Sequence, residues 1–89
     1  MRNDQLEKLR TDIDAIDHEL LRLIKKRLNL TGEIGRIKKE KKMAIIDSSR
    51  EEALFNALAE YCEEMKLDKV FIKNVWRLIL NASYLTQDK

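Results

Sequence analysis

The sequence predicts an all-α protein built from one long helix followed by two shorter helices. The chain of 89 residues contains no proline and only two glycines, the residues that interrupt helices most often. It is 44% hydrophobic and 38% charged, which is typical of helical proteins. Leucine and isoleucine recur in its first half at alternating steps of three and four, the period of a helix with one apolar face. The length allows a single domain over residues 1–89.

The first helix is expected over residues 4–41, with Asn3 or Asp4 as its N-cap. It contains both glycines, Gly32 and Gly35, which are tolerated best in a helix where another backbone or a ligand comes close. Its apolar heptad positions form a seam, which consists of Leu6, Leu9, Ile13, Ile16, Leu20, Leu23, Leu30, Ile34 and Ile37.

Three cations of this helix stand out by their positions. Arg27 occupies the one seam position that is not apolar. Arg10 and Lys38 lie one step off the seam and are 28 residues apart, so four whole heptads place them on the same flank. At a rise of 1.5 Å per residue, about 42 Å separates them. A small ligand therefore cannot contact both in the same chain.

The second helix is expected to begin at Asp47-Ser48-Ser49, after a short connection over residues 41–47. Ser48 with Glu51, and Ser49 with Glu52, match the pattern of a capping box. We expect the inner face to consist of Leu54, Leu58, Tyr61 and Met65. Continued towards the N-terminus, this face reaches the carboxylates of Glu51 and Asp47.

The third helix is expected to follow Asp68, which is suited to cap it. It carries two apolar stripes, Phe71, Val75, Leu78, Ala82 and Leu85 on one and Ile72, Trp76 and Ile79 on the other. The second stripe continues into Ser83 and Gln87. Gln87 lies two residues from the end of the chain, where a helix is prone to fray.

The polar residues that continue inward faces form one set, which consists of Arg10, Arg27, Lys38, Asp47, Glu51, Ser83 and Gln87. Three cations suit a small molecule with more than one carboxylate, since Arg binds carboxylates bidentately and Lys acts as a point charge. With His18 as the only histidine, the set contains no Cys-His or Ser-His pair. It matches no metal-ligand pattern and no glycine-rich phosphate loop. Such a set can hold one conformer and stabilise developing charge without a covalent step.

Each of these residues alone has a structural interpretation. Arg27 could specify helix register, as buried polar residues do in coiled coils. Glu51 could serve only in a capping box, and Ser83 and Gln87 only at a helix end. Arg10 and Lys38 could be ordinary surface cations. The functional interpretation gains because all of them continue inward faces.

Composition argues against several classes of partner. The net charge is +2 with acids and bases interspersed, and no basic tract carries interleaved aromatics, so we expect no nucleic-acid binding. No apolar run reaches the length of a membrane span and no signal peptide is apparent, so we expect no membrane association. Cys62 is the only cysteine, which excludes an internal disulfide and favours a reducing compartment. We therefore expect a cytoplasmic protein.

In five segments the sequence resembles the all-helical, AroQ-type chorismate mutases, in particular the small domain found free-standing or fused to prephenate dehydratase. The segments are residues 9–17 (LRTDIDAID), 26–27 (KR), 34–38 (IGRIK), 47–51 (DSSRE) and 82–87 (ASYLTQ). Their order and separations match without a gap. The resemblance implies an isomerase that rearranges chorismate to prephenate, on the route to phenylalanine and tyrosine, without a cofactor or a metal.

The resemblance also implies roles for the set. Arg10 and Arg27 would hold the two carboxylates of chorismate, while Lys38 and Gln87 would donate to the ether oxygen. Glu51 would accept from the ring hydroxyl, assisted by the backbone near Asp47. Ser83 would contact a carboxylate. Arg50 would support Glu51 without contacting the substrate itself.

The family resemblance and the spacing of Arg10 and Lys38 together predict an intertwined homodimer of six helices, in which Arg10 comes from the partner chain. Two alternatives remain open at this point. Isochorismate-pyruvate lyase shares the fold and the cations, although Asp47 and Ser83 fit the mutase pattern better. A non-catalytic dimerisation or regulatory module would bind a dianionic ligand without turnover.

Overall fold

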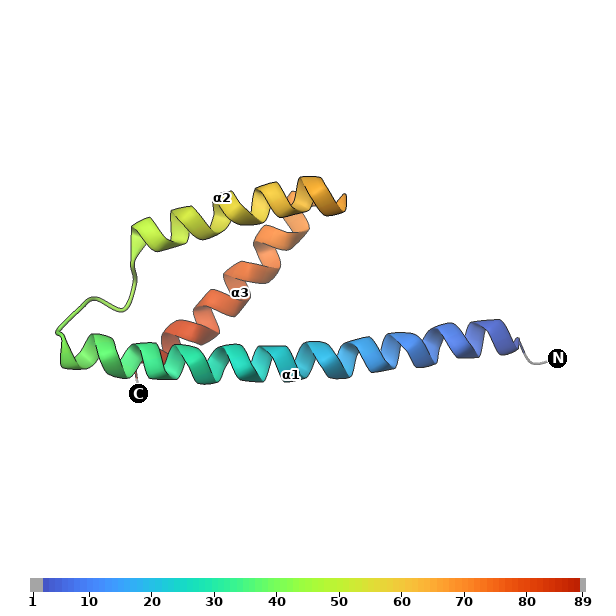
Figure 1. The fold of residues 1–89 in the computed structure, drawn as a ribbon, viewed down its shortest axis with the longest axis horizontal. Coiled ribbons are helices and arrows are strands. Elements are labelled where there is room, and N and C mark those ends of the chain that lie inside the picture. The colour runs from blue at the N-terminus through green and yellow to red at the C-terminus, as the bar shows by residue number, and fades with distance from the viewer. Residues whose placement is uncertain (1–2, 89) are drawn as a thin grey trace.

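The computed structural model describes residues 3–88 and contains three helices and no strand within that range (Figure 1). Helix α1 spans Asp4–Glu40, α2 spans Ser48–Met65 and α3 spans Lys69–Gln87. The predicted all-α class and the order of one long and two shorter helices are confirmed. Helix α1 continues through both glycines and gives the chain a length of 63 Å. None of these helices is apolar over a length that would cross a membrane.

Side chains outside each helix cap its N-terminus. Asn3, rather than Asp4, caps α1, because its side-chain oxygen accepts from the backbone N–H of Leu6 at 3.0 Å. Asp68 caps α3 as expected. Helix α2 differs from the expectation: Asp47 caps it by accepting from the backbone N–H of Arg50 at 3.1 Å. The predicted capping boxes are therefore wrong, and the Glu51 side chain is used elsewhere.

Helix α3 joins the other two helices. It runs obliquely from the far end of α2 to the C-terminal half of α1 and packs on both, whereas α1 and α2 do not pack directly within the described chain (Figure 1). Its second apolar stripe faces inward, with Ile72, Trp76 and Ile79 partly buried. Its first stripe remains mostly at the surface, where Phe71, Leu78 and Leu85 are all exposed.

The inner face of α2 lies slightly to one side of the predicted one. Leu54 and Leu58 are partly buried as expected, but Tyr61 and Met65 are exposed. Cys62 is buried in their place. The face that packs on α3 is therefore set by Leu58 and Cys62, one helical turn apart.

The ends of α1 and α3 meet at Gly35. A β-carbon built at Gly35 would lie 2.7 Å from the carbonyl oxygen of Gln87 and closer still to its Cα. Any other residue at this position would therefore push the end of α3 away. Gly32 has no atom within 4 Å of such a β-carbon, so the expected close approach applies to Gly35 alone within this chain.

A single chain buries very little apolar surface. Within residues 3–88 the buried apolar side chains are Cys62 and Leu80, whereas the polar residues Thr31, Ser83 and Gln87 are also buried. Every apolar residue of the predicted α1 seam is at least 41% exposed. Most of the buried side chains of the single chain are therefore polar and lie between α1 and α3.

Candidate active site

A cavity of about 190 Å³ lies between the C-terminal half of α1, the start of α2 and the end of α3. Six of the seven residues of the predicted polar set line it, namely Arg27, Lys38, Asp47, Glu51, Ser83 and Gln87. The structure therefore brings together residues that are up to 60 positions apart in the sequence. It does not bring Arg10 to this cavity.

Arg27 enters the cavity from α1 and is held by α3. Its Nη1 donates to the Ser83 hydroxyl oxygen at 2.8 Å, and Ser83 is only 1% exposed. The Ser83 hydroxyl in turn donates to the carbonyl oxygen of Ile79 at 2.8 Å. Because its one proton is used there, Ser83 can only accept in the cavity, and it positions the Arg27 guanidinium.

Lys38 lines the same cavity from a position about three turns further along α1. Its ammonium donates to the side-chain oxygen of Gln87 at 2.8 Å and to the backbone carbonyl of Ile45. The amide NH₂ of Gln87 is thereby left to donate elsewhere. Gln87 is the last residue of α3 and is 8% exposed, so the structure places this turn in the helix and against the cavity.

Glu51 is held by two residues of α3. Its Oε2 accepts from the Tyr84 hydroxyl at 2.6 Å and its Oε1 accepts from Arg77 Nη1 at 2.7 Å. The Tyr84 hydrogen bond is the main reason that the pKa of Glu51 lies below its ordinary value; burial opposes this shift and Arg77 adds to it. Burial, followed by the Glu51 hydrogen bond, raises the pKa of Tyr84 to about 12. The cation that contacts Glu51 in the structure is thus Arg77, whereas Arg50 lines the cavity and its support of Glu51 stays a prediction.

Sequence reasoning missed Tyr84 and Arg77, and also Thr31. Thr31 is buried between α1 and α3, where its hydroxyl lies 2.9 Å from that of Thr86. Its spacing of four residues from both Arg27 and Gly35 could have revealed it, because the three lie on one face of α1.

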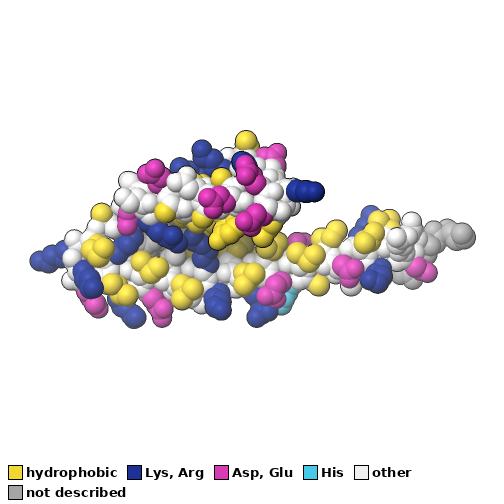
Figure 2. Space-filling model, turned by 45° about the horizontal axis from the view of Figure 1, so that its top comes forward, with side chains coloured by type: hydrophobic (Ala, Val, Ile, Leu, Met, Phe, Trp, Pro, Cys, Tyr) yellow, Lys and Arg dark blue, Asp and Glu magenta, His cyan; other side chains and the backbone are white. Residues whose placement is uncertain are grey.

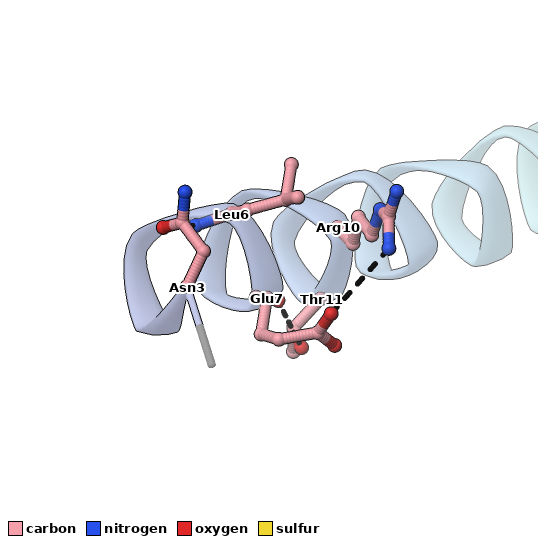
Figure 3. Close-up of polar contacts among 5 residues, drawn as sticks. All are labelled: Asn3, Leu6, Glu7, Arg10 and Thr11. Carbon is pink, nitrogen blue, oxygen red and sulfur yellow. Dashed lines mark hydrogen bonds and ion pairs between the residues drawn. The ribbon is translucent and has the colours of Figure 1, made fainter. Parts of the chain in front are cut away.

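Arg10 lies near the N-terminus of α1 (Figure 3), whereas the α1 residues that line the cavity begin at Arg27. It contacts Glu7 at 3.4 Å in an exposed pair, next to Thr11, whose hydroxyl bonds the Glu7 carbonyl (Figure 3). Helix α1 is unbroken between Arg10 and Lys38, so the separation of about 42 Å holds within one chain.

The cavity combines two anchored cations, an amide donor and an ionised carboxylate. Arg27 and Lys38 can attract an anion. Gln87 can donate to an oxygen that is neutral or that gains negative charge, and Glu51 can accept from a hydroxyl. His, Cys, Asp and Glu residues do not gather in groups of three that could hold a metal anywhere in the described range. The arrangement can therefore bind and polarise an anionic ligand by electrostatics.

Comparison with known proteins gives consistent similarities. The model of a family described as chorismate mutase type II matches residues 9–88. The chain is 36% identical over 89 residues to the bifunctional chorismate mutase/prephenate dehydratase of Aquifex aeolicus, covering 97% of this chain and 25% of that protein. It is 30% identical over 86 residues to the T-protein of Haemophilus influenzae, covering 97% and 23%.

A shorter relative is matched over most of its length. The 4-amino-4-deoxychorismate mutase of Streptomyces venezuelae is 26% identical over 85 residues, which cover 96% of this chain and 82% of that protein. The chain thus spans about a quarter of the two longer relatives and most of the shorter one.

Proposed function

The chain belongs to the chorismate mutase type II family, and from this premise we propose that it is an isomerase that rearranges chorismate to prephenate. One observation about this chain's own residues supports the proposal most directly. Arg27 and Lys38 are both anchored from α3, by Ser83 and Gln87, and both line one cavity together with Glu51. Arg27 can bind one carboxylate of chorismate, Lys38 and Gln87 can donate to its ether oxygen, and Glu51 can accept from its ring hydroxyl.

The proposed reaction needs no nucleophile and no proton transfer. The ether C–O bond of chorismate breaks while a new C–C bond forms, and the ether oxygen gains negative charge on the way. Lys38 and the NH₂ of Gln87 stabilise that charge, because both are donors held in place before the reaction begins. Arg27 binds a carboxylate and Glu51 accepts from the ring hydroxyl, which fixes the reactive conformer.

A second carboxylate needs a second cation, which we assign to Arg10 of a partner chain. Within one chain about 42 Å of helix separates Arg10 from Lys38. If two long helices run antiparallel, the N-terminal half of one lies beside the C-terminal half of the other, and Arg10 reaches the partner's cavity. The two sites of such a homodimer are equivalent by symmetry.

The exposed apolar surface supports this dimer. Figure 2 shows hydrophobic side chains at the surface along the long helix, and the seam residues on it are between 41% and 58% exposed. The first stripe of α3 is exposed as well, with Leu78 at 71%. Apolar surface of this extent marks a protein interface, and a second copy with the same seam covers it by the heptad pattern. The proposed assembly is an intertwined dimer of six helices.

The direct test is the loss of chorismate ultraviolet absorbance on addition of purified protein. We expect saturable turnover by the wild-type chain, with prephenate as the product. The control is an Arg27→Ala chain, purified in the same way, which should be nearly inactive because Arg27 binds a carboxylate. Pyruvate release from isochorismate, without prephenate from chorismate, would instead indicate a lyase. Thermal stabilisation by a dianionic transition-state mimic without any turnover would indicate a binding module.

A further inference from the structure

Glu51 forms a wall between the cavity and the outside of the molecule. It lines the cavity on one side and an open hollow between α2 and α3 on the other. Tyr84 lines only the cavity, whereas Arg77 lines only the outer hollow. The two residues that bond Glu51 therefore line different hollows, Tyr84 the cavity and Arg77 the outer one.

The contacts assign one oxygen of Glu51 to each side. The inner residue, Tyr84, bonds Oε2 at 2.6 Å, and the outer residue, Arg77, bonds Oε1 at 2.7 Å. Arg77 and Tyr84 are seven residues apart, which is two turns, so one face of α3 supplies both donors. The guanidinium of Arg77 also lies 4.5 Å from the centre of the Phe55 ring, and Phe55 follows Glu51 by one turn on α2.

This geometry restricts the carboxylate. Turning it out of this orientation would break both charge-assisted hydrogen bonds, and the Glu51 side chain is only 19% exposed. We propose that Tyr84 and Arg77 are positioning residues that hold Glu51 with Oε2 turned into the cavity, where it accepts from the ring hydroxyl of the substrate. This inference rests on the proposed mutase function.

The hydrogen-bonded pair of Tyr84 and Glu51 also determines which chemical group of a ligand can bind beside it. The single proton of the Tyr84 hydroxyl is already donated to Glu51, so the pair presents only acceptors to the cavity. A substrate must therefore offer a polar hydrogen at this position. The other charged groups around the cavity are Arg27 and Lys38 from α1 and Asp47 and Arg50 from the start of α2.

A double-mutant cycle tests whether Tyr84 acts through Glu51. We expect Tyr84→Phe to lower kcat/KM about tenfold, the order of effect for a hydrogen bond to a charged group. In a Glu51→Gln chain the same change should have less than about a twofold effect, because the anion is already gone. Equal losses in both backgrounds would mean that Tyr84 only supports the fold, and no loss in the wild-type background would overturn the inference.

The pH dependence of kcat/KM is a second measurement, and it would not change if Tyr84 only supported the fold. Tyr84 lowers the pKa of Glu51, so Tyr84→Phe should raise that pKa. The acid limb of the kcat/KM profile should therefore move to higher pH. Arg77→Gln should move it in the same direction, with Arg77→Lys closer to wild type. Tyr61→Phe is the matched control, since Tyr61 is exposed and should leave the limb in place.

A measurement without substrate separates this inference from the proposed function. Tyr61 and Tyr84 are the only tyrosines, so a Tyr61→Phe chain reports Tyr84 alone in an ultraviolet titration. Adding Glu51→Gln should shift the titration of Tyr84 below its pKa of about 12. No shift would overturn the pairing whether or not the protein turns over chorismate. A wild-type chain without turnover would contradict the proposed function, while a shift would still support the pairing.

Discussion

At the scale of single residues, the hydrogen bond between Lys38 and Gln87 determines what Gln87 can do. An ammonium has donors and no acceptor, so the Gln87 atom that it contacts at 2.8 Å must be the oxygen. The NH₂ group then points to the other side of the amide. Gln87 can thus donate in the cavity at any pH, because an amide does not titrate.

The first prediction follows from that neutrality. Wild-type activity should stay flat through mildly alkaline pH as far as Gln87 is concerned, whereas Gln87→Glu should make the reaction faster as the pH falls. Only a protonated carboxyl can donate to the ether oxygen, and a carboxylate would repel the developing charge. The measurement is kcat/KM against pH for both chains. Gln5→Glu, at an exposed position of α1, makes the same chemical change away from the site.

Lys38 should act on the chemical step more than on binding. The charge on the ether oxygen exists mainly in the transition state, so Lys38→Ala should lower kcat by roughly 10²-fold or more. The adjacent Lys39→Ala is the control, because Lys39 is exposed in the last turn of α1. Steady-state kinetics give the answer: an unchanged kcat with a raised KM would assign Lys38 to ground-state binding.

The sequence predicted the cavity residues better than it predicted their partners. Arg27 interrupts an apolar stripe, Glu51 extends one and Lys38 lies one step off the seam, and polar residues at such positions are visible in a periodic pattern. Tyr84 and Arg77 leave no such signal, because their roles depend on how α3 crosses α2. The family resemblance assigned Arg50 to Glu51, but the contact that the structure shows comes from Arg77, 26 residues further along the chain.

At the scale of elements, the contact between Gly35 and Gln87 controls how closely the end of α3 approaches α1. Because Gln87 Cα and carbonyl oxygen are the nearest atoms, a side chain at position 35 would collide with backbone and not with a flexible group. The helix pattern alone suggested that a glycine here serves a close approach. It could not tell Gly35 from Gly32, since only the packing of α3 separates them.

Gly35→Ala should therefore harm both stability and activity. We expect it to lower the free energy of unfolding by about 1–3 kcal/mol, as overpacking does, and to lower kcat because Gln87 is displaced. Gly32→Ala is the matched control: it should leave kcat unchanged and stabilise α1 by up to about 1 kcal/mol. Denaturant unfolding and steady-state kinetics on the two variants measure both effects. A Gly35→Ala chain as stable and active as wild type would contradict the close contact.

At the scale of the whole molecule, the apolar surface that the chain leaves uncovered is as informative as the cavity. Periodicity identified the seam of α1 and both stripes of α3, but it could not say which of them pack within one chain. The structure buries or partly buries the second stripe of α3 and leaves the seam exposed. The seam runs from Leu6 to Ile37, so Arg10 lies near one of its ends and Lys38 at the other, as the proposed site shared between two antiparallel chains requires.

The proposed sharing of each site between two chains makes a quantitative prediction for mixed dimers. Arg10→Ala and Arg27→Ala homodimers should each be nearly inactive, since every site lacks one carboxylate-binding arginine. When the two chains are mixed, unfolded and refolded together, a mixed dimer has one site with both arginines and one site with neither. Random pairing makes half of the dimers mixed, so about one quarter of wild-type activity should return if the two sites are independent. Refolding each variant alone is the control. A mixture that stays as inactive as its parents would mean that Arg10 does not reach a partner's cavity, and that the second carboxylate is bound by another residue.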